Sequence, residues 1–431
     1  MEGEERMTVD ERYKYLRRMQ KRYRKAGRKL RGELLDEMEA VTGLHRKSLV
    51  RLMRGEIWRQ KRTRERGVVY GAAVRGVIGQ VARSLSYPGA ERLRPWLAWT
   101  ARHLAQHGEV ALTAEVEALL ERISVSTLRR ILRDMPRDLP RPRPPAPRNR
   151  SAVAAEVPIT RIPWDVGEVG HMEVDLVHHS GPTAAGEYVH TLQLLDVHTG
   201  WSERVAVLGR SYLVVQHGVR YSAHRLPFAV KELHVDNGLE FLNAHFLRMT
   251  KEVFPQARLS RSRPYHKNDN RYVEGANRTL VRRYLGRDRL DTVAHVHMLN
   301  RLYNQLWLYD NFFQPVQRLR GKEMRVNGEG KRRVHRILDE ALPPLDRLLR
   351  AQVLDPTNAE RLLRWREAIN VMRLREAIYA RIEALFALPL AGKRRQDVRK
   401  SLLLPQGEDF LSQAIVPDGE IPWWECTTSH P

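Results

Sequence analysis

Three acidic residues stand in settings where a carboxylate is costly unless it meets a cation or a hydrogen-bond donor. Asp175 lies in the middle of the apolar segment MEVDLV, and Asp236 ends the segment ELHVD before Asn-Gly. Glu274 falls in the first turn of a predicted helix. Acids at the ends of different elements can converge, and carboxylate oxygens suit Mg²⁺ or Mn²⁺. We therefore predict a catalytic metal site at Asp175, Asp236 and Glu274.

Such a site serves one class of reaction well. When water or a 3′-hydroxyl attacks a phosphodiester, negative charge builds on the oxygens around phosphorus. Two metal ions about 3.5–4 Å apart can activate the nucleophile and stabilise the leaving oxygen. We therefore expect two Mg²⁺ or Mn²⁺ ions as cofactors. No covalent intermediate is required, so no catalytic Ser or Tyr is expected.

Polar and basic residues surround the predicted helix that carries Glu274. Residues three and four positions away share its helical face, where they can contact DNA phosphates or simply remain solvated. The residues that we expect to contact DNA beside the metal site are Lys267, Asn270, Arg271, Asn277 and Arg278.

Two features near Asp175 leave alternatives open. Glu173 alternates with Asp175 in an extended segment, so the two share a face and Glu173 can assist the site. Several histidines occur nearby, where they can form a zinc site or lie on strand surfaces. Because no ligand spacing with cysteine accompanies them, the surface interpretation is favoured. These histidines are His171, His178, His179, His190 and His198.

Apolar runs bounded by Gly or polar turns predict the elements that position the acids. The predicted strands are 171–178, 188–197, 202–207, 229–235 and 257–263. The predicted helices among them are 211–225, 243–254 and 271–285. This β-β-β-α-β-α-β-α order implies an α/β fold with a mixed sheet flanked by helices.

The N-terminal part is helical and basic. Residues 12–31 contain eleven Lys or Arg and no acid, which favours contact with nucleic acid. Residues 33–55 and 111–135 each resemble a helix-turn-helix, the first turning at Gly43 and the second capped by Ser126. Ordinary helical hairpins also fit this pattern. The basic residues expected to contact DNA here are Arg46, Lys47, Arg51, Arg129, Arg130 and Arg133.

Composition limits the classes of protein that remain. The 431 residues include 75 Lys and Arg against 51 Asp and Glu, a formal net charge of +24 that favours polyanionic partners. The single cysteine, Cys426, excludes an intrachain disulfide and fits a reducing compartment such as the cytosol. No signal peptide and no apolar run of about 18 residues occurs, so we expect no membrane partner.

Pro and Arg dominate residues 136–150, which predicts an extended linker. After the sheet, residues 291–308 and 359–388 carry helical periodicity, and 321–333 is a basic, Gly-bearing loop. The predicted parts are 1–68 (basic arm and helix-turn-helix), 69–135 (second helix-turn-helix region), 136–162 (linker), 163–325 (catalytic core) and 326–431 (helical region and basic tail).

The segments HMEVDLV, HVDNGLEF and SRPYHKNDNRYVEGANRTLVRR resemble the three blocks of the DDE integrase core. Retroviral integrases and many bacterial insertion-sequence transposases share that core. The resemblance covers about residues 165–290 and implies an RNase-H-like fold with Asp175, Asp236 and Glu274 as the metal-binding triad. The second and third acids are separated by two residues more than in the commonest spacing of the family.

The helix-turn-helix regions favour the bacterial transposase branch over the retroviral one. The resemblance then implies an enzyme that binds element ends, cuts DNA and joins it to target DNA. It also implies a homo-oligomer on DNA, in the cytoplasm at the bacterial nucleoid. Two alternatives remain, a nuclease of the same fold that does not join strands and a non-catalytic DNA-binding regulator.

Overall fold

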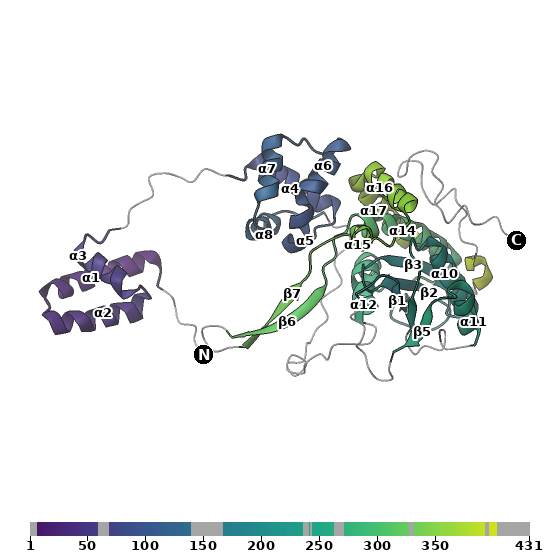
Figure 1. The fold of residues 1–431 in the computed structure, drawn as a ribbon, viewed down its shortest axis with the longest axis horizontal. Coiled ribbons are helices and arrows are strands. Elements are labelled where there is room, and N and C mark those ends of the chain that lie inside the picture. The colour runs from purple at the N-terminus through teal and green to yellow at the C-terminus, as the bar shows by residue number, and fades with distance from the viewer. Residues whose placement is uncertain are drawn as a thin grey trace. The chain divides into compact units, whose positions relative to one another are not determined.

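The chain forms two compact units, Met1–Val69 and Tyr70–Pro431, which Figure 1 colours along the sequence. The finer division into five parts stays a prediction, and most of the predicted linker lies outside the described residues. The computed structural model describes residues 7–58, 69–138, 167–235, 241, 244–262, 271–326, 332–392 and 396–402.

The first unit is a three-helix arrangement around a small core of its own. Its helices are α1 (Val9–Lys25), α2 (Arg28–Thr42) and α3 (Arg46–Arg54). Leu16, Met38 and Leu49 are buried at its centre. Gly43 ends α2 in the left-handed conformation, at φ 65°, which glycine adopts without strain. The two helices expected within residues 33–55, with a turn at Gly43, are confirmed as α2 and α3.

Five further helices open the second unit. They are α4 (Ala72–Ser84), α5 (Ala90–Leu93), α6 (Leu97–Gln106), α7 (Ala114–Arg122) and α8 (Val125–Arg133), with a 3₁₀ turn η1 (Arg94–Trp96) before α6. The predicted cap of α8 was misplaced by two residues. Ser124, not Ser126, caps α8 by accepting a hydrogen bond from the Thr127 N–H. The helix consequently begins earlier than expected.

A mixed five-stranded sheet forms the centre of the second unit. Its strands are β1 (His171–His178), β2 (Val189–Asp196), β3 (Ser202–Leu208), β4 (Glu232–Val235) and β5 (Arg258–Arg261). They lie in the order β3-β2-β1-β4-β5. β1 pairs antiparallel with β2 and parallel with β4. The predicted order of elements is confirmed, and it is consistent with an RNase-H-like core.

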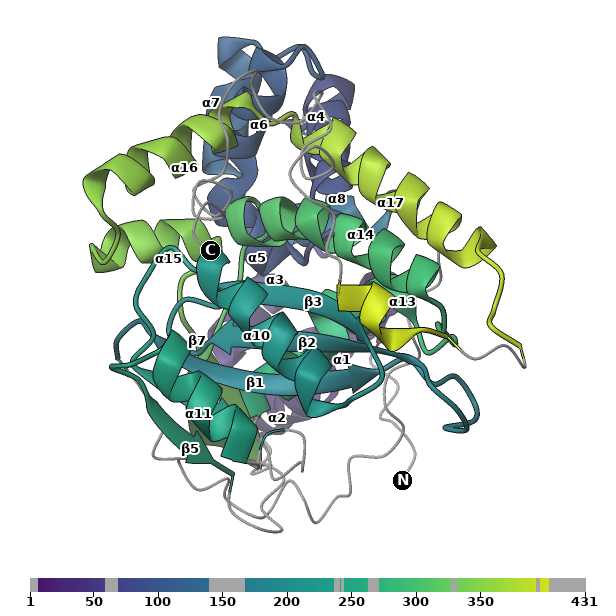
Figure 2. The same ribbon diagram turned by 90° about the vertical axis from the view of Figure 1, so that its right-hand side faces the viewer.

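Helices flank this sheet. They are α10 (Tyr212–Arg225), α11 (Ala244–Val253), α12 (Arg271–Ala276), the π-helical turn η2 (Asn277–Arg282), α13 (Arg283–Leu285) and α14 (Val293–Phe312). Figure 2 shows α10 and α11 in front of the strands. Gly218 of α10 allows close packing, because a Cβ there would lie 2.9 Å from Leu192 of β2. No helix among the described residues is long and apolar enough to cross a membrane.

Two buried ion pairs attach β3 to its neighbouring helices. Arg204 lies 2.7 Å from Asp310 of α14, and Arg225 of α10 lies 3.1 Å from Glu203. Burial raises the pKa of both Glu203 and Asp310, and the arginines oppose that shift. These four residues were not predicted to have a role, although the charges inside the apolar segment SERVAV are a signal of buried pairing.

The C-terminal elements correct two expectations. They are β6 (Leu319–Val326), β7 (Arg332–Leu338), α15 (Pro344–Ala351), α16 (Pro356–Ala368), α17 (Val371–Ala387) and the 3₁₀ turn η3 (Val398–Leu402). The continuous helix expected at 359–388 is two helices, because Asn370 accepts hydrogen bonds from backbone N–H groups and caps α17. Strands β6 and β7 occupy most of the expected loop at 321–333.

Candidate metal-dependent active site

Asp175 is held in β1 by amide hydrogen bonds. Its Oδ1 accepts a 2.8 Å hydrogen bond from the Leu176 N–H, and its Oδ2 accepts a 2.5 Å hydrogen bond from Asn277 Nδ2. The side chain is half-buried. These two amide donors fix the orientation of the carboxylate in β1.

The parallel pairing of β1 and β4 brings the first two acid-bearing segments together. Val174 and Val235 are register partners. The residue after Val174 is Asp175, and β4 ends at Val235, to which Asp236 is covalently bonded. Asp236 itself lies outside the described residues, as do Lys267 and Asn270.

Glu274 lies exposed on α12, which packs against β1 and β2. Figure 1 shows α12 beside β1. Val273 of this helix is fully buried against Leu195 of β2, and its N–H donates a 2.7 Å hydrogen bond to Glu173 Oε2. N–H groups in the first turn of a helix have no partner within the helix, so Glu173 satisfies one of them. Glu173 thus positions the helix that carries Glu274.

Asn277 and Glu274 lie one helical turn apart, and Asn277 begins the π-helical turn η2. Single π-helical turns often occur at functional sites. The sequence predicted that Asn277 contacts DNA, whereas the structure gives it Asp175 as a partner. Arg278 is exposed. Arg271 lies in α12, and its side chain is outside the described set.

Two side-chain amides at this site, of the buried Gln193 and the half-buried Asn277, have buried atoms without a hydrogen-bond partner among the described residues. Gln193 of β2 pairs directly with Asp175 across the strands and is fully buried. Neither its Nε2 nor its Oε1 has a hydrogen-bond partner among the described residues, and the same is true of Asn277 Oδ1. Gln193 was not predicted to belong to the site, although a polar residue in the apolar segment TLQLLD is a signal.

The donor set at this site suits a hard divalent cation. The carboxylates of Asp175 and Glu274 and the carbonyl oxygens of Gln193 and Asn277 are all oxygen donors, which Mg²⁺ and Mn²⁺ prefer. Within the described ranges, no group of three or more His, Cys, Asp or Glu could hold a metal ion. The predicted third carboxylate belongs to Asp236, which those ranges omit.

The nearby histidines have protein partners. His179 Nε2 lies 2.8 Å from Thr191 Oγ1, and burial lowers its pKa to about 3. His171 lies between Glu168 and Glu232. His178 packs edge-on against His190, with ring centres 4.8 Å apart. These contacts favour a structural role over a zinc site. The expected position on strand surfaces is wrong for His179 and His190, which are buried.

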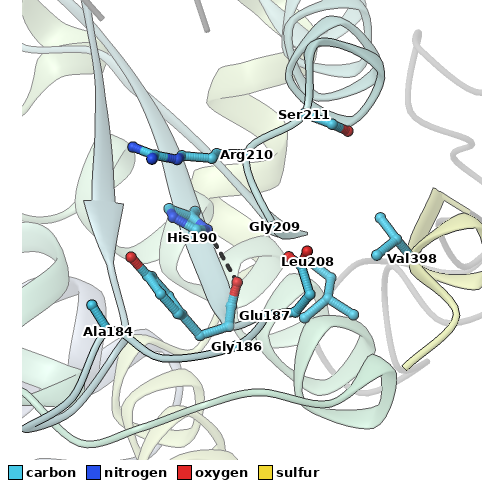
Figure 3. Close-up of a pocket in the computed structure, with 10 residues that line it drawn as sticks. Ala184, Gly186, Glu187, His190, Leu208, Gly209, Arg210, Ser211 and Val398 are labelled. Atoms are coloured by element: carbon cyan, nitrogen blue, oxygen red, sulfur yellow. Dashed lines mark hydrogen bonds between the residues drawn. The ribbon is translucent and has the colours of Figure 1, made fainter. Parts of the chain in front are cut away.

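Figure 3 shows a hollow of about 350 Å³ at the other end of the β1–β2 pair. His190 lines it, and its Nδ1 lies 3.1 Å from the Tyr188 carbonyl, which can only accept a hydrogen bond. Nδ1 therefore carries the proton, and burial lowers the pKa of His190 to about 4. None of the three predicted acids lines this hollow, so it is separate from the candidate metal site.

The six basic residues that were predicted to contact DNA in the helix-turn-helix regions differ in their contacts within the chain. Arg46 pairs with Asp36 and Arg129 with Glu91, so these two arginines are engaged within the chain. The other four predicted DNA contacts are exposed, with Arg133 lying 3.1 Å from Asp134. These four are Lys47, Arg51, Arg130 and Arg133.

The uncharacterized protein y4rM of Sinorhizobium fredii (strain NBRC 101917 / NGR234) is 32% identical to this chain over 331 residues. The aligned region covers 76% of this chain and 91% of that protein. The chain belongs to the y4rM family. No model of a known protein family matches the chain.

This y4rM-family chain is also similar to the catalytic core domain of BIV integrase, at 20% identity, covering 27% of this chain and 68% of that one, with a TM-score of 0.22. A likeness with this TM-score supports no conclusion about function.

Proposed function

We propose that this protein is the DNA transposase of an insertion sequence. In this proposal, Asp175, Asp236 and Glu274 hold two Mg²⁺ or Mn²⁺ ions, and the enzyme cuts DNA at element ends and joins the freed 3′-hydroxyl to target DNA. The observation that carries the proposal is the pairing of Val174 with Val235, each followed directly in sequence by one of the predicted acids. The resemblance of the three sequence blocks supports it independently.

The contacts of α12 support the placement of the third acid. Glu173 accepts from the first turn of that helix, and Asn277 donates to Asp175 one turn beyond Glu274. Further along, Arg282 Nη2 donates a 2.6 Å hydrogen bond to the His178 carbonyl at the end of β1. A helix attached at three points to one strand keeps Glu274 in a defined position relative to Asp175.

Each residue of the site has a distinct role in this proposal. The Leu176 N–H and Asn277 hold both oxygens of Asp175 and so fix its orientation before substrate arrives. The buried carboxylate of Glu173 fixes the helix. When bound, the ions would supply activation of the attacking oxygen and stabilisation of the leaving oxygen. Arg278 and the other basic residues of this region would contact the phosphates.

The remaining parts of the proposal rest on charge and on the resemblance to insertion-sequence transposases. The exposed basic residues of α3 and α8 would bind element ends, in the manner of recognition helices. Because two element ends must be processed together, we propose a homo-oligomer on DNA, working at the bacterial nucleoid. A net charge of +24 supports a polyanionic partner.

The test uses labelled duplexes taken from the DNA on either side of the protein's own gene, incubated with the full chain and Mg²⁺ or Mn²⁺. We expect both nicked and joined products from the wild type and neither from Asp175→Asn or Asp236→Asn, with DNA binding retained. Nicking without joining would indicate the nuclease alternative. Binding without either product would indicate a regulator, and joining by either variant would refute the assignment.

A further inference from the structure

The antiparallel hairpin of β6 and β7 carries a dense and unusual distribution of charge. Residues 319–338 contain seven Lys or Arg and two acids. The register places Lys322 opposite Arg336 and Arg325 opposite Arg333. The positive residues therefore occupy both strands along the hairpin. A polyanion would complement this excess of positive charge.

Exposed apolar side chains lie on the same hairpin. Met324 and Val334 are register partners, 61% and 46% exposed, and Ile337 and Leu338 are also exposed. An isolated two-stranded hairpin is only marginally stable in water. Exposed apolar side chains of this kind are typical of a binding surface, so we expect the hairpin to contact another molecule.

The base of the hairpin is fixed to the second unit by several hydrogen bonds. Asp339 accepts from the Arg318 N–H at 2.6 Å and from Arg347 Nη1 at 2.9 Å. Val316 and Leu342 form a β-bridge just beyond it. Arg318 also donates a 3.4 Å hydrogen bond to the Asp196 carbonyl at the end of β2. The hairpin is thus anchored to the same sheet that carries Asp175.

We infer that the β6–β7 hairpin is a duplex-DNA-binding ribbon. The major groove of B-DNA is about 12 Å wide and admits a two-stranded ribbon. The cations would contact phosphates, while Met324 and Val334 would contact sugars or thymine methyl groups at its centre. This inference rests on the proposal that the protein acts on DNA, and it assigns a DNA contact outside the helix-turn-helix regions and the metal site.

The test measures how salt changes the affinity of the full chain for a fluorescent duplex of random sequence. The hairpin variant is Arg320→Gln with Arg336→Gln, because both residues are exposed. The matched control removes the same charge from α11 by Arg248→Gln with Lys251→Gln, which are also exposed. Circular dichroism checks that all proteins are folded equally.

Each phosphate contact contributes about 0.9 to the slope of log affinity against log salt. We expect the hairpin variant to reduce the magnitude of that slope by about 1.8 and to weaken binding about tenfold at moderate salt. The control should change the slope by less than half as much. A slope equal to that of wild type would overturn the inference. So would a change in oligomeric mass at unchanged slope, which would indicate that a second copy of the chain occupies the hairpin.

This test separates two kinds of failure. If the hairpin variant loses slope while the wild type neither cuts nor joins DNA, the catalytic proposal fails and the hairpin inference stands. If the wild type cuts and joins while the slope is independent of the hairpin, only the hairpin inference fails. Met324→Ser provides a further readout, because loss of the apolar contact should weaken binding without changing the slope.

Discussion

Two strands of one sheet carry buried or half-buried acids, and the partners of these acids differ. Glu203 of β3 lies 3.1 Å from Arg225, whose positive charge balances it. Asp175 of β1 receives hydrogen bonds from the amides of Leu176 and Asn277, which orient its two carboxylate oxygens. The comparison shows two ways of holding an acid in one sheet, by a buried ion pair and by amide donors, and the second is the arrangement that we propose for a metal ligand.

The largest effect should follow from removing the cation of the β3 pair. Arg225→Met leaves Glu203 buried without its counterion and should lower the free energy of unfolding by about 3–5 kcal/mol. Urea unfolding followed by circular dichroism measures this. Arg220→Met, on the same helix, breaks the exposed pair with Glu252 and should cost at most about 1 kcal/mol. Equal effects of the two variants would contradict the structural role of the buried pair.

Asn277→Ala tests the amide that orients Asp175. Because residues that position metal ligands typically contribute 10–100-fold to affinity, we expect Mn²⁺ binding by calorimetry to weaken by about that factor. Thr279→Ala, two residues away and exposed, is the control and should bind Mn²⁺ as wild type does. Unchanged affinity in Asn277→Ala would mean that its hydrogen bond is incidental to the site.

His190 extends the comparison to a buried base whose one hydrogen bond within the described part of the chain is to a carbonyl. Its pKa of about 4 in the folded protein lies below the ordinary value of 6.5, so the unfolded chain binds its proton first as pH falls. The contribution of His190 to stability should therefore decrease between pH 6.5 and pH 4, by about 2 kcal/mol at pH 5. In urea unfolding, His190→Phe should remove this share of the pH dependence and leave the share of other buried histidines such as His179. The exposed His224→Gln should leave the pH dependence unchanged.

Arg278 should give the smallest effect. Its exposed position beside Asn277 fits a single phosphate contact, which contributes about 0.9 to the salt slope. Arg278→Gln should therefore weaken DNA binding only a few-fold and reduce the magnitude of the slope by about 0.9. Fluorescence anisotropy at several salt concentrations measures both values. A variant that binds with the wild-type slope would show that Arg278 of η2 does not contact the phosphates.

The sheet was predictable because its strands are apolar runs ended by Gly or polar turns. β1 spans the predicted range, and β2 and β3 differ from theirs by one or two residues. Expectations failed where local capping outweighed hydrophobic periodicity. Asn370 interrupts an otherwise regular helical pattern, and Ser124 rather than Ser126 caps α8. The β6–β7 hairpin was missed because basic residues and glycines obscure its alternation.

The candidate site was predictable in its residue types and only partly in its contacts. Resemblance and spacing selected Asp175 and Glu274, but no pattern along the chain reveals which residues meet across elements. Asn277 lies 102 positions from its partner Asp175. Glu173 lies 100 positions from Val273, whose N–H it accepts. Such contacts depend on strand register and on the docking of α12, which tertiary packing decides.

The central claim is that three carboxylates share one divalent-metal site, and metal binding tests it most directly. We would titrate Mn²⁺ into wild type, Asp175→Asn, Asp236→Asn and Glu274→Gln by calorimetry, with the exposed Glu252→Gln as control. We expect the wild type and the control to bind Mn²⁺ and each of the three variants to lose that binding. A variant of any of the three that binds Mn²⁺ with wild-type affinity and stoichiometry would contradict it.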